Sequence, residues 1–239
     1  MKISLFLILL VSFCAHALEV DLPRGKSGQI IKREGYSLRY NSECKIPHWV
    51  SYVIAKQSLT GNISRTNDFR EDREIRGVQA GLEDYRRSGF NRGHMARAGL
   101  YTTSRKLKSE TFILSNIVPQ DPYMNQNGAW RKAEDFEEES IEKYGEAQII
   151  SGPLLDANMQ RIGANEVCVP NYLFKVIFRG GSKPQGIAFI IPNFRTSESY
   201  RSYAVSIDEV EKLTGLDFLS ALPDQVENQI ESRFDFSQW

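Results

Sequence analysis

Histidine and cysteine are both scarce in this sequence. The 239 residues contain three histidines, His16, His48 and His94, and three cysteines, none of them at a CxxC spacing. Structural zinc sites use four cysteine or histidine ligands, and many catalytic ones use several histidines. The scarcity therefore argues against a zinc centre. Any chemistry that needs an imidazole must rest on a single histidine.

Long apolar runs are also lacking, except near the N-terminus. Lys2, the apolar residues 3–13 and the small-x-small sequence Ala15-His16-Ala17 predict a signal peptide over residues 1–17. The run is shorter than the about 20 residues that span a bilayer. A buried N-terminal helix is the alternative interpretation. We expect cleavage after Ala17, a secreted or periplasmic protein, and no stable membrane association afterwards.

No low-complexity tract, internal repeat or Gly/Ser/Pro-rich linker divides the rest of the chain. Residues 18–239 (239 − 17 = 222 residues) are therefore expected to form a single domain, against a prior of about 100–200 residues per domain. Formal charge is balanced, with 30 basic and 30 acidic residues. Net charge alone therefore gives no sign of a nucleic-acid partner, and the oligomeric state is left open.

Two cysteines, Cys44 and Cys168, remain after the predicted cleavage. An even number of cysteines in an exported protein is compatible with a disulfide. Closing so long a loop would stabilise the fold by up to about 4–5 kcal/mol in the chain-entropy model. Two buried free thiols are the alternative. We predict that the two cysteines are bonded.

Patterning of apolar residues predicts more strands than helices. Residues 18–46 are polar and irregular, and the charged residues 67–87 are typical of a surface loop. Expected strands are 49–54, 111–114, 147–155, 169–178 and 186–191, with a turn at 116–120. Expected helices are 128–144, closed by Gly145, and one opened by the capping box at Ser206 and ended by Gly215. The pattern favours a mixed α+β fold on a largely antiparallel sheet with packed helices.

His94 is the strongest candidate for acid–base chemistry. It follows Arg92, whose planar fork can hold an anion, and Gly93, which allows a close approach by backbone or ligand. A neutral imidazole suits a general base near physiological pH. The alternative interpretation is a core histidine beside a surface arginine.

Asn125 and Glu134 offer hard oxygen donors. Asn125 precedes the 128–144 helix, and Glu134 lies at the border of its apolar face. Amide and carboxylate oxygens suit Mg²⁺, which keeps several waters and needs few protein ligands. Alternatively, Asn125 is a helix N-cap and Glu134 is solvated.

Residues 65–108 are locally basic, with eleven Lys and Arg against six Asp and Glu (11 − 6 = +5). A basic face on a neutral protein is what a polyanionic substrate requires. A charged, solvated loop would show the same composition.

Several ordered motifs together make the chain resemble the DNA/RNA non-specific endonucleases, the ββα-metal nucleases that include endonuclease G. The resemblance covers roughly residues 47–222. It is carried by Trp49-Val50 with Tyr52, Arg65 ahead of Phe69-Arg70-Glu71-Asp72, Ser88-Gly89-Phe90-Asn91-Arg92-Gly93-His94, Ser115-Asn116-Ile117-Val118-Pro119-Gln120, Asn125 with Trp130 and Glu134, Ser151-Gly152-Pro153-Leu154, and Val169-Pro170 with Phe174-Lys175-Val176. It implies a ββα-metal nuclease core.

The resemblance also implies a role for each matching residue. His94 would be the general base, Arg92 would contact the substrate phosphate, and Arg65 would stabilise charge on the phosphoryl group. Asn125 would be the direct protein ligand of Mg²⁺, or of Mn²⁺ in its place. Glu134 would hold a water on that metal.

Asn116 would brace the loop that carries the metal ligand. Three positions depart from the family pattern. Asn91 stands where many members carry Asp, and Glu138 stands where many place Arg. The spacing between Asn125 and Trp130 is one residue longer than in the shorter family form, which leaves Asn127 as a second candidate ligand.

These observations predict a Mg²⁺-dependent, sugar-non-specific endonuclease that acts on DNA and RNA and leaves 5′-phosphate ends. The alternative is a catalytically silent, nuclease-like module that binds polyanions.

Overall fold

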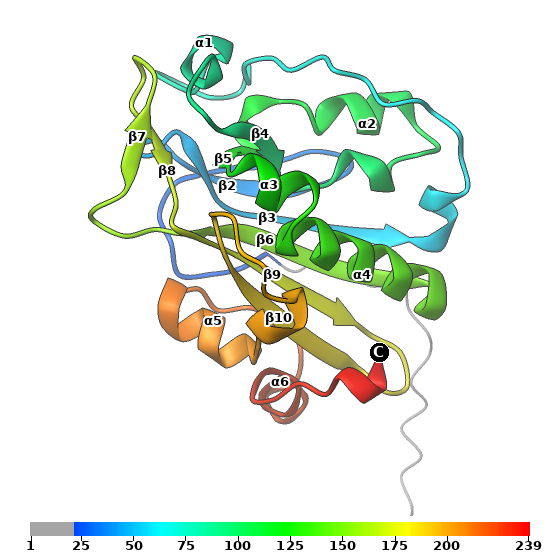
Figure 1. Ribbon diagram of the computed structural model, residues 1–239. Helices are drawn as coiled ribbons and strands as arrows, with labels where there is room; N and C mark the ends of the chain where they lie inside the picture. Colours follow the sequence, from blue (N-terminus) through cyan, green and yellow to red (C-terminus); the bar gives the residue numbers. More distant parts are fainter. Residues whose placement is uncertain (1–21) are drawn as a thin grey trace, which may run out of the picture.

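A seven-stranded sheet, in which every neighbouring pair of strands is antiparallel, forms the centre of the protein (Figure 1). This computed structural model describes residues 22–239, so the predicted signal peptide over residues 1–17 lies outside the described part. In spatial order the strands are β1 (Gln29–Lys32), β2 (Ser37–Asn41), β3 (Ile46–Ala55), β6 (Glu146–Leu154), β9 (Tyr172–Arg179), β10 (Gln185–Pro192) and β11 (Ala204–Val205). The predicted mixed α+β fold on a largely antiparallel sheet is confirmed.

Alternation along the central strands divides the core into two layers. On β9, Leu173 and Ile177 belong to one hydrophobic cluster, whereas Phe174 and Val176 belong to the other. Successive side chains of a strand point to opposite faces of a sheet, so the two clusters lie on opposite sides of it. Both faces of the sheet must therefore be covered.

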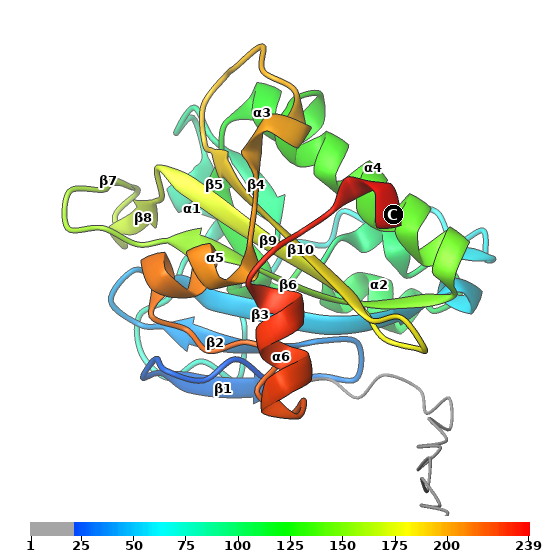
Figure 2. The same cartoon turned by 90° about the horizontal axis from the view of Figure 1, so that it is seen from below.

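Helices cover the two faces unequally. The long helix α4 (Ala129–Tyr144) packs on one face, and α5 (Ile207–Thr214) and α6 (Asp224–Glu231) pack on the other (Figure 2). The helix predicted over 128–144 is confirmed, and Gly145 closes it with a φ of 95°. The shorter helices are α1 (Leu82–Tyr85), α2 (Arg105–Glu110) and α3 (Pro122–Gln126), with 3-10 turns at Lys56–Leu59, Ala98–Leu100, Leu114–Asn116, Tyr200–Tyr203 and Phe236–Gln238. None of the described helices is long and apolar enough to cross a bilayer.

A separate two-stranded sheet, β4 (Asn91–His94) with β5 (Ile117–Gln120), lies on the same side as α4. Here the strand predicted over 111–114 is wrong, and the residues assigned to a turn at 116–120 form a strand instead. Thr111 to Ile113 turn the chain out of α2, while Ile117 to Gln120 are drawn into extended backbone by pairing with β4. A short apolar run in the sequence does not show whether a neighbouring strand will pair with it, so the two runs could not be told apart.

The stretch 18–46, predicted to be irregular, contains β1 and β2 in its described part. Tyr36, Leu38 and Tyr40 are nonetheless buried against the core. Of the polar residues between them, Ser37 is also buried and Arg39 is half-buried, so the alternation is too short and too mixed to predict these strands from sequence alone.

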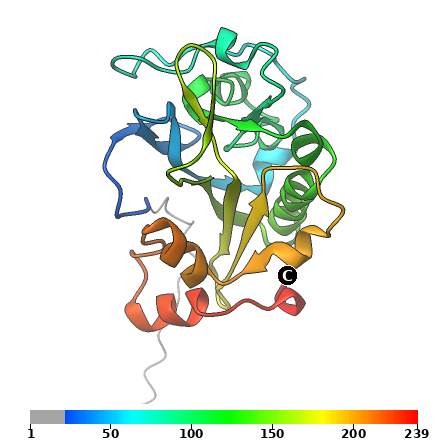
Figure 3. The same ribbon diagram turned by 60° about the vertical axis from the view of Figure 1, so that its left-hand side comes forward.

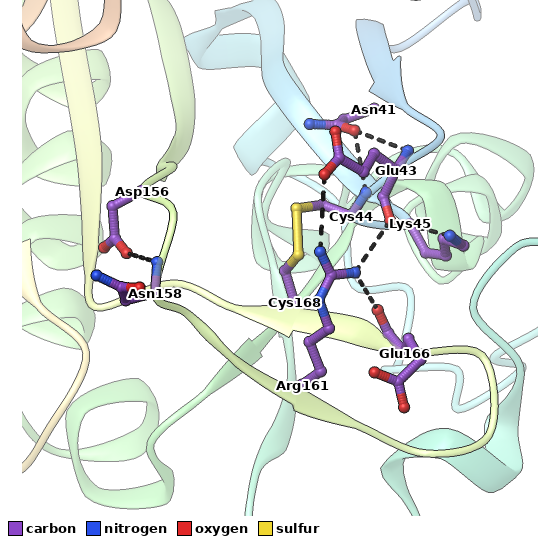
Figure 4. The surroundings of a disulfide bond; sticks show 9 residues. All are labelled: Asn41, Glu43, Cys44, Lys45, Asp156, Asn158, Arg161, Glu166 and Cys168. Carbon is purple, nitrogen blue, oxygen red and sulfur yellow. Dashed lines mark hydrogen bonds and ion pairs between the residues drawn. A yellow bond between two sulfur atoms is a disulfide. The ribbon is translucent and has the colours of Figure 1, made fainter.

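A second hairpin, β7 (Gln160–Ile162) with β8 (Val167–Val169), is tied to the rest of the molecule by a disulfide between Cys44 and Cys168, whose Cα atoms are 4.9 Å apart. Figure 4 shows Arg161 beside this bond, with its Nη1 donating to the backbone carbonyl of Glu166 at 3.1 Å. The hairpin tip then holds α1, because Asn165 Nδ2 donates to Asp84 Oδ2 at 2.8 Å.

Candidate active site

His94 is placed by the pairing of β4 with β5, in which it lies opposite Ile117. Gly93, beside it, faces the buried side chain of Gln120. A Cβ added at Gly93 would come within 2.0 Å of Gln120 Cδ, so only glycine fits at that position. The predicted close approach at Gly93 is therefore made by a side chain of the neighbouring strand, and it fixes the register that presents His94.

Aromatic rings hold the His94 imidazole. Its centroid lies 4.8 Å from the ring of Phe112, edge to face, and 5.4 Å from the ring of Phe69. Within residues 22–239 no hydrogen-bond partner reaches its buried Nε2. Burial, together with the positive charges of Arg65 and Arg92, lowers the pKa of His94 to about 3. The imidazole is thus neutral at physiological pH and free to accept a proton.

The two arginines beside His94 rest on the same aromatic rings. Arg92 Cζ lies 4.1 Å from the centroid of Phe69, and Arg65 Cζ lies 5.2 Å from that of Phe112. Neither arginine forms an ion pair with another described residue. A guanidinium held over a ring keeps its hydrogen-bond donors available, so both can receive an anion.

Asn116 lies beneath the site, fully buried, and forms a two-way bridge to the backbone after His94. Its Oδ1 accepts from the Ala96 amide at 2.8 Å, and its Nδ2 donates to the carbonyls of Ala96 at 3.0 Å and Thr111 at 2.8 Å. It therefore connects the end of β4 to the start of β5 and rigidifies both.

Asn125 lies inside α3 and is not an N-cap. Asp121 caps this helix by accepting from the Met124 amide at 2.9 Å. The Asn125 side chain has no hydrogen-bond partner among the described residues and lines the cavity in front of His94. Asn127, the second candidate ligand, is exposed and does not line that cavity.

Glu134 is more deeply buried than its border position on α4 predicts, with 7% of its surface exposed. Its Oε1 accepts from Trp130 Nε1 at 3.2 Å, and its Oε2 lies 3.6 Å from Arg97 Nε and 3.9 Å from Arg131 Nη1. Burial raises the pKa of Glu134 to about 7, although Lys175 and Arg97 oppose that rise. One carboxylate oxygen thus remains poorly satisfied at the wall of the cavity.

Arg97 is a site residue that the sequence did not single out. Its Nη1 donates to Glu138 Oε2 at 2.7 Å and to the backbone carbonyl of Glu134 at 2.9 Å. Glu138, the departure from the family pattern, therefore holds a cation that comes from another segment. The sequence offered one signal for this pair: Arg97 follows His94 by three residues, and Glu138 follows Glu134 by four.

These side chains surround one open cavity of about 810 Å³. It is lined by His94, Asn125, five arginines and two glutamates, and Arg86 and Glu83 neutralise each other at 3.2 Å. The charged lining residues that remain are Arg65, Arg92, Arg97, Arg131 and Glu134. The structure thus brings together His94, Arg65, Arg92, Asn125 and Glu134, with Asn116 behind them and the Cys44–Cys168 disulfide elsewhere.

The donors in this cavity suit a hard divalent cation. An uncommitted amide oxygen on Asn125 and an incompletely satisfied carboxylate on Glu134 both face it, whereas no thiolate lines it and His94 is the only imidazole there. Oxygen-only donors with room for water fit Mg²⁺ or Mn²⁺ rather than zinc.

Known proteins are similar to this chain in sequence and in fold. The chain is 34% identical to zebrafish (Danio rerio) nuclease EXOG, mitochondrial, over 79% of its own length and 60% of that protein. It is 33% identical to human endonuclease G, mitochondrial, over 80% of its own length and 69% of that protein. A chain in the crystal structure of the EndoG/EndoGI complex superposes with a TM-score of 0.78 at 29% identity, covering 84% of this chain and 89% of that one.

A neutral histidine, facing arginines and a pair of oxygen donors on one small ββα unit form the arrangement that the resemblance to the ββα-metal nucleases implies. The DNA/RNA non-specific endonuclease family matches residues 15–225, and the chain belongs to this family of nucleic-acid-hydrolysing enzymes. It spans about 60% of the length of the zebrafish relative.

The prediction of a secreted or periplasmic location is contradicted by these relatives, both of which are named as mitochondrial proteins. That prediction rested on residues 1–17, which lie outside the described residues. A short apolar run behind one lysine is a weak indicator of compartment, because cleaved targeting segments of several kinds begin with basic and apolar residues.

Proposed function

We propose that this chain is a Mg²⁺-dependent, sugar-non-specific endonuclease that hydrolyses the phosphodiester bonds of DNA and RNA and leaves 5′-phosphate ends. One observation carries the proposal. His94, neutral and free of hydrogen bonds, lies in a cavity with unpaired Arg65 and Arg92 on one side and Asn125 and Glu134 on the other.

In this proposal Arg65 and Arg92 bind the phosphate of the substrate, and His94 takes a proton from the attacking water. Arg92 and Arg65 hold the non-bridging phosphate oxygens, whose charge they neutralise. His94 accepts a proton from a water molecule as the water oxygen bonds to phosphorus and the bond to the 3′ oxygen breaks, and the departing 3′ oxygen takes a proton from solvent to become a hydroxyl. The bound phosphate also counters the two arginines that depress the pKa of His94, so the base strengthens when substrate is present.

Asn125 would hold the divalent cation, with Glu134 beside it, and Mn²⁺ is the natural substitute. When bound, the cation supplies Lewis-acid stabilisation of charge on the phosphate. Arg97 keeps the Glu134 carboxylate oriented, and Glu138 keeps Arg97 in place. Sugar tolerance follows because the lining groups that face the substrate are suited to phosphate rather than to a ribose hydroxyl or a base edge.

A catalytically silent module that binds polyanions is the competing function, because the two unpaired arginines, Arg65 and Arg92, would retain nucleic acid without hydrolysis. Purified protein incubated with plasmid DNA and with RNA, with Mg²⁺ and with EDTA, separates the two. We expect cleavage of both substrates that EDTA abolishes and that ends in 5′-phosphate. Binding in a gel-shift assay without any metal-dependent cleavage would establish the silent module instead.

A further inference from the structure

On the face of the sheet opposite the cavity, α5 and α6 lie side by side (Figure 3, orange and red). Ile207 and Val210 of α5 and Ile230 of α6 pack in one apolar cluster against the sheet. Acidic side chains gather where the two helices meet.

Three carboxylates from the two helices converge there. Asp208 and Glu211 are one helical turn apart on α5, and Glu231 ends α6. One carboxylate oxygen from each lies within 4.8 Å of the other two. Neither Asp208, Glu211 nor Glu231 forms an ion pair with any residue that the structure describes. Like charges placed this close destabilise the pair of helices unless something neutralises them.

Glu231 provides a second and independent sign of a ligand. Only 5% of its surface is exposed, and its Oε1 is buried with no hydrogen-bond partner among residues 22–239. Burial and the neighbouring charges of Glu211 and Glu227 raise the pKa of Glu231 to about 9. Nearly all buried polar atoms in proteins have a partner, so an orphaned oxygen on a buried carboxylate that is grouped with two others indicates a bound cation.

The neighbouring groups orient this cluster and leave it open. Glu211 Oε1 accepts from the Phe218 amide at 2.7 Å, which fixes its side chain and leaves its second oxygen for a ligand. Lys212, the adjacent cation on α5, lies 3.8 Å from Glu209 and forms no ion pair with the three carboxylates of the cluster. Asp208 is exposed, so an ion can enter from solvent.

We propose that Asp208, Glu211 and Glu231 bind one Ca²⁺ ion that clamps α5 to α6, at a site separate from the catalytic cavity. Opposed oxygens around Ca²⁺ are about 4.6–5.2 Å apart, and those around Mg²⁺ about 4.0–4.2 Å, twice the respective metal–oxygen distances. The three carboxylate oxygens of this cluster lie within 4.8 Å of one another, so one ion of the larger size can lie between them without movement of the helices. Water completes its coordination on the side of Asp208.

The clamp has a structural consequence beyond the two helices. The chain that leaves α6 returns to α4, where Phe236 and Trp239 lie 5.9 Å and 5.5 Å from the ring of Phe136. Fixing α6 therefore fixes the C-terminal segment against the helix that carries Glu134. Ca²⁺ at this site is a stabilising ion, and its effect is measurable without any nucleic acid.

The test is thermal unfolding and calorimetric titration of EDTA-treated, desalted protein with CaCl₂ and, separately, MgCl₂. We expect one Ca²⁺ bound per chain at this site and a rise in Tm of about 5–10 °C at about 100 times its Kd. Glu231→Gln should lose that rise. Glu209→Gln, a matched change on the same helix outside the cluster, should keep it, and so should Asn125→Ala, which alters only the catalytic cavity.

Three results would overturn the proposal. The first is a wild-type Tm that Ca²⁺ does not change, as expected if Glu231 is simply protonated. The second is an equal rise in Glu231→Gln. The third is a MgCl₂ rise equal to that of CaCl₂ at the same concentration, which would show no preference for the larger ion. None of these outcomes depends on whether the chain cleaves nucleic acid.

Discussion

Glu134 and Glu137 are neighbours one turn apart on the buried side of α4, and their surroundings differ completely. Glu137 is fully buried, and it accepts hydrogen bonds from Tyr52 Oη at 2.9 Å and from Lys175 Nζ at 2.7 Å. Glu134 has one hydrogen bond, from Trp130, and its second oxygen faces the cavity at longer distances from two arginines.

The difference separates a structural carboxylate from one that is available for function. Both side chains had to leave water, which costs several kcal/mol per ion unless partners replace the lost hydration. Glu137 has such partners from two elements, β3 and β9, and its partner Lys175 also donates to Ser151 Oγ on β6 at 3.3 Å. Glu134 lacks them, and a cation or its waters would complete its shell. Burial alone therefore does not distinguish the two roles, whereas the count of partners does.

The largest expected effect is on activity at His94. His94→Ala should lower the cleavage rate by about 10²–10⁴-fold, the usual contribution of a general base. The midpoint of urea unfolding of this variant, and its affinity for DNA in the presence of EDTA, should change little. The reason is that the imidazole makes no hydrogen bond in the described structure. His48→Ala is the matched control, since His48 lies on β3 away from the cavity. Activity of His94→Ala within threefold of wild type would remove His94 from the mechanism.

The next largest effect is on stability at Glu137. Glu137→Gln should lower the free energy of unfolding by about 3–5 kcal/mol, because it leaves Lys175 charged, buried and unpaired. Urea unfolding followed by circular dichroism measures the change, with the exposed Glu139→Gln on the same helix as control. A loss below about 1 kcal/mol would mean that the ion pair is dispensable and that our comparison with Glu134 fails.

Glu134→Gln should show the opposite behaviour, with a stability close to that of the wild type and a cleavage rate lower by about 10–100-fold. Asn125→Ala should be more severe, and it should also raise the Mg²⁺ concentration needed for half-maximal cleavage, because Asn125 would contact the cation directly. A Mg²⁺ titration of cleavage for both variants measures this.

Asn127→Ala is the control for that titration, because Asn127 lies outside the cavity. If Asn127→Ala shifts the metal requirement and Asn125→Ala does not, the ligand has been assigned two residues too early in the sequence.

The smallest predicted effect concerns the pair that orients Glu134. Glu138→Arg should lower cleavage about tenfold, since it places a second guanidinium beside Arg97 and removes that residue's partner. Arg97→Glu combined with Glu138→Arg should recover most of the loss, because the reversed pair again puts a cation next to Glu134. Contacting charges typically couple by about 0.5–3 kcal/mol. A double variant whose loss equals the product of the two single losses would show that Arg97 and Glu138 act independently.

Local sequence information determined the elements that are long or strongly patterned. The helix that became α4, closed by Gly145, and strands β3, β6, β9 and β10 were predicted because each repeats its apolar pattern over many residues. The order of motifs around His94, Asn125 and Glu134 likewise predicted the family and the set of residues that the cavity brings together.

Tertiary structure alone decided the features that depend on a partner distant in the sequence. Ile117 to Gln120 became a strand because β4 lies beside it, and Arg97 met Glu138 because β4 and α4 pack at the same cavity. The different environments of Glu134 and Glu137 could not be predicted from the sequence either, because Lys175 and Tyr52, the partners of Glu137, come from the distant strands β9 and β3. Hydrogen bonding and the electrostatic cost of burial depend on three-dimensional neighbours, and a one-dimensional pattern does not specify which residues those will be.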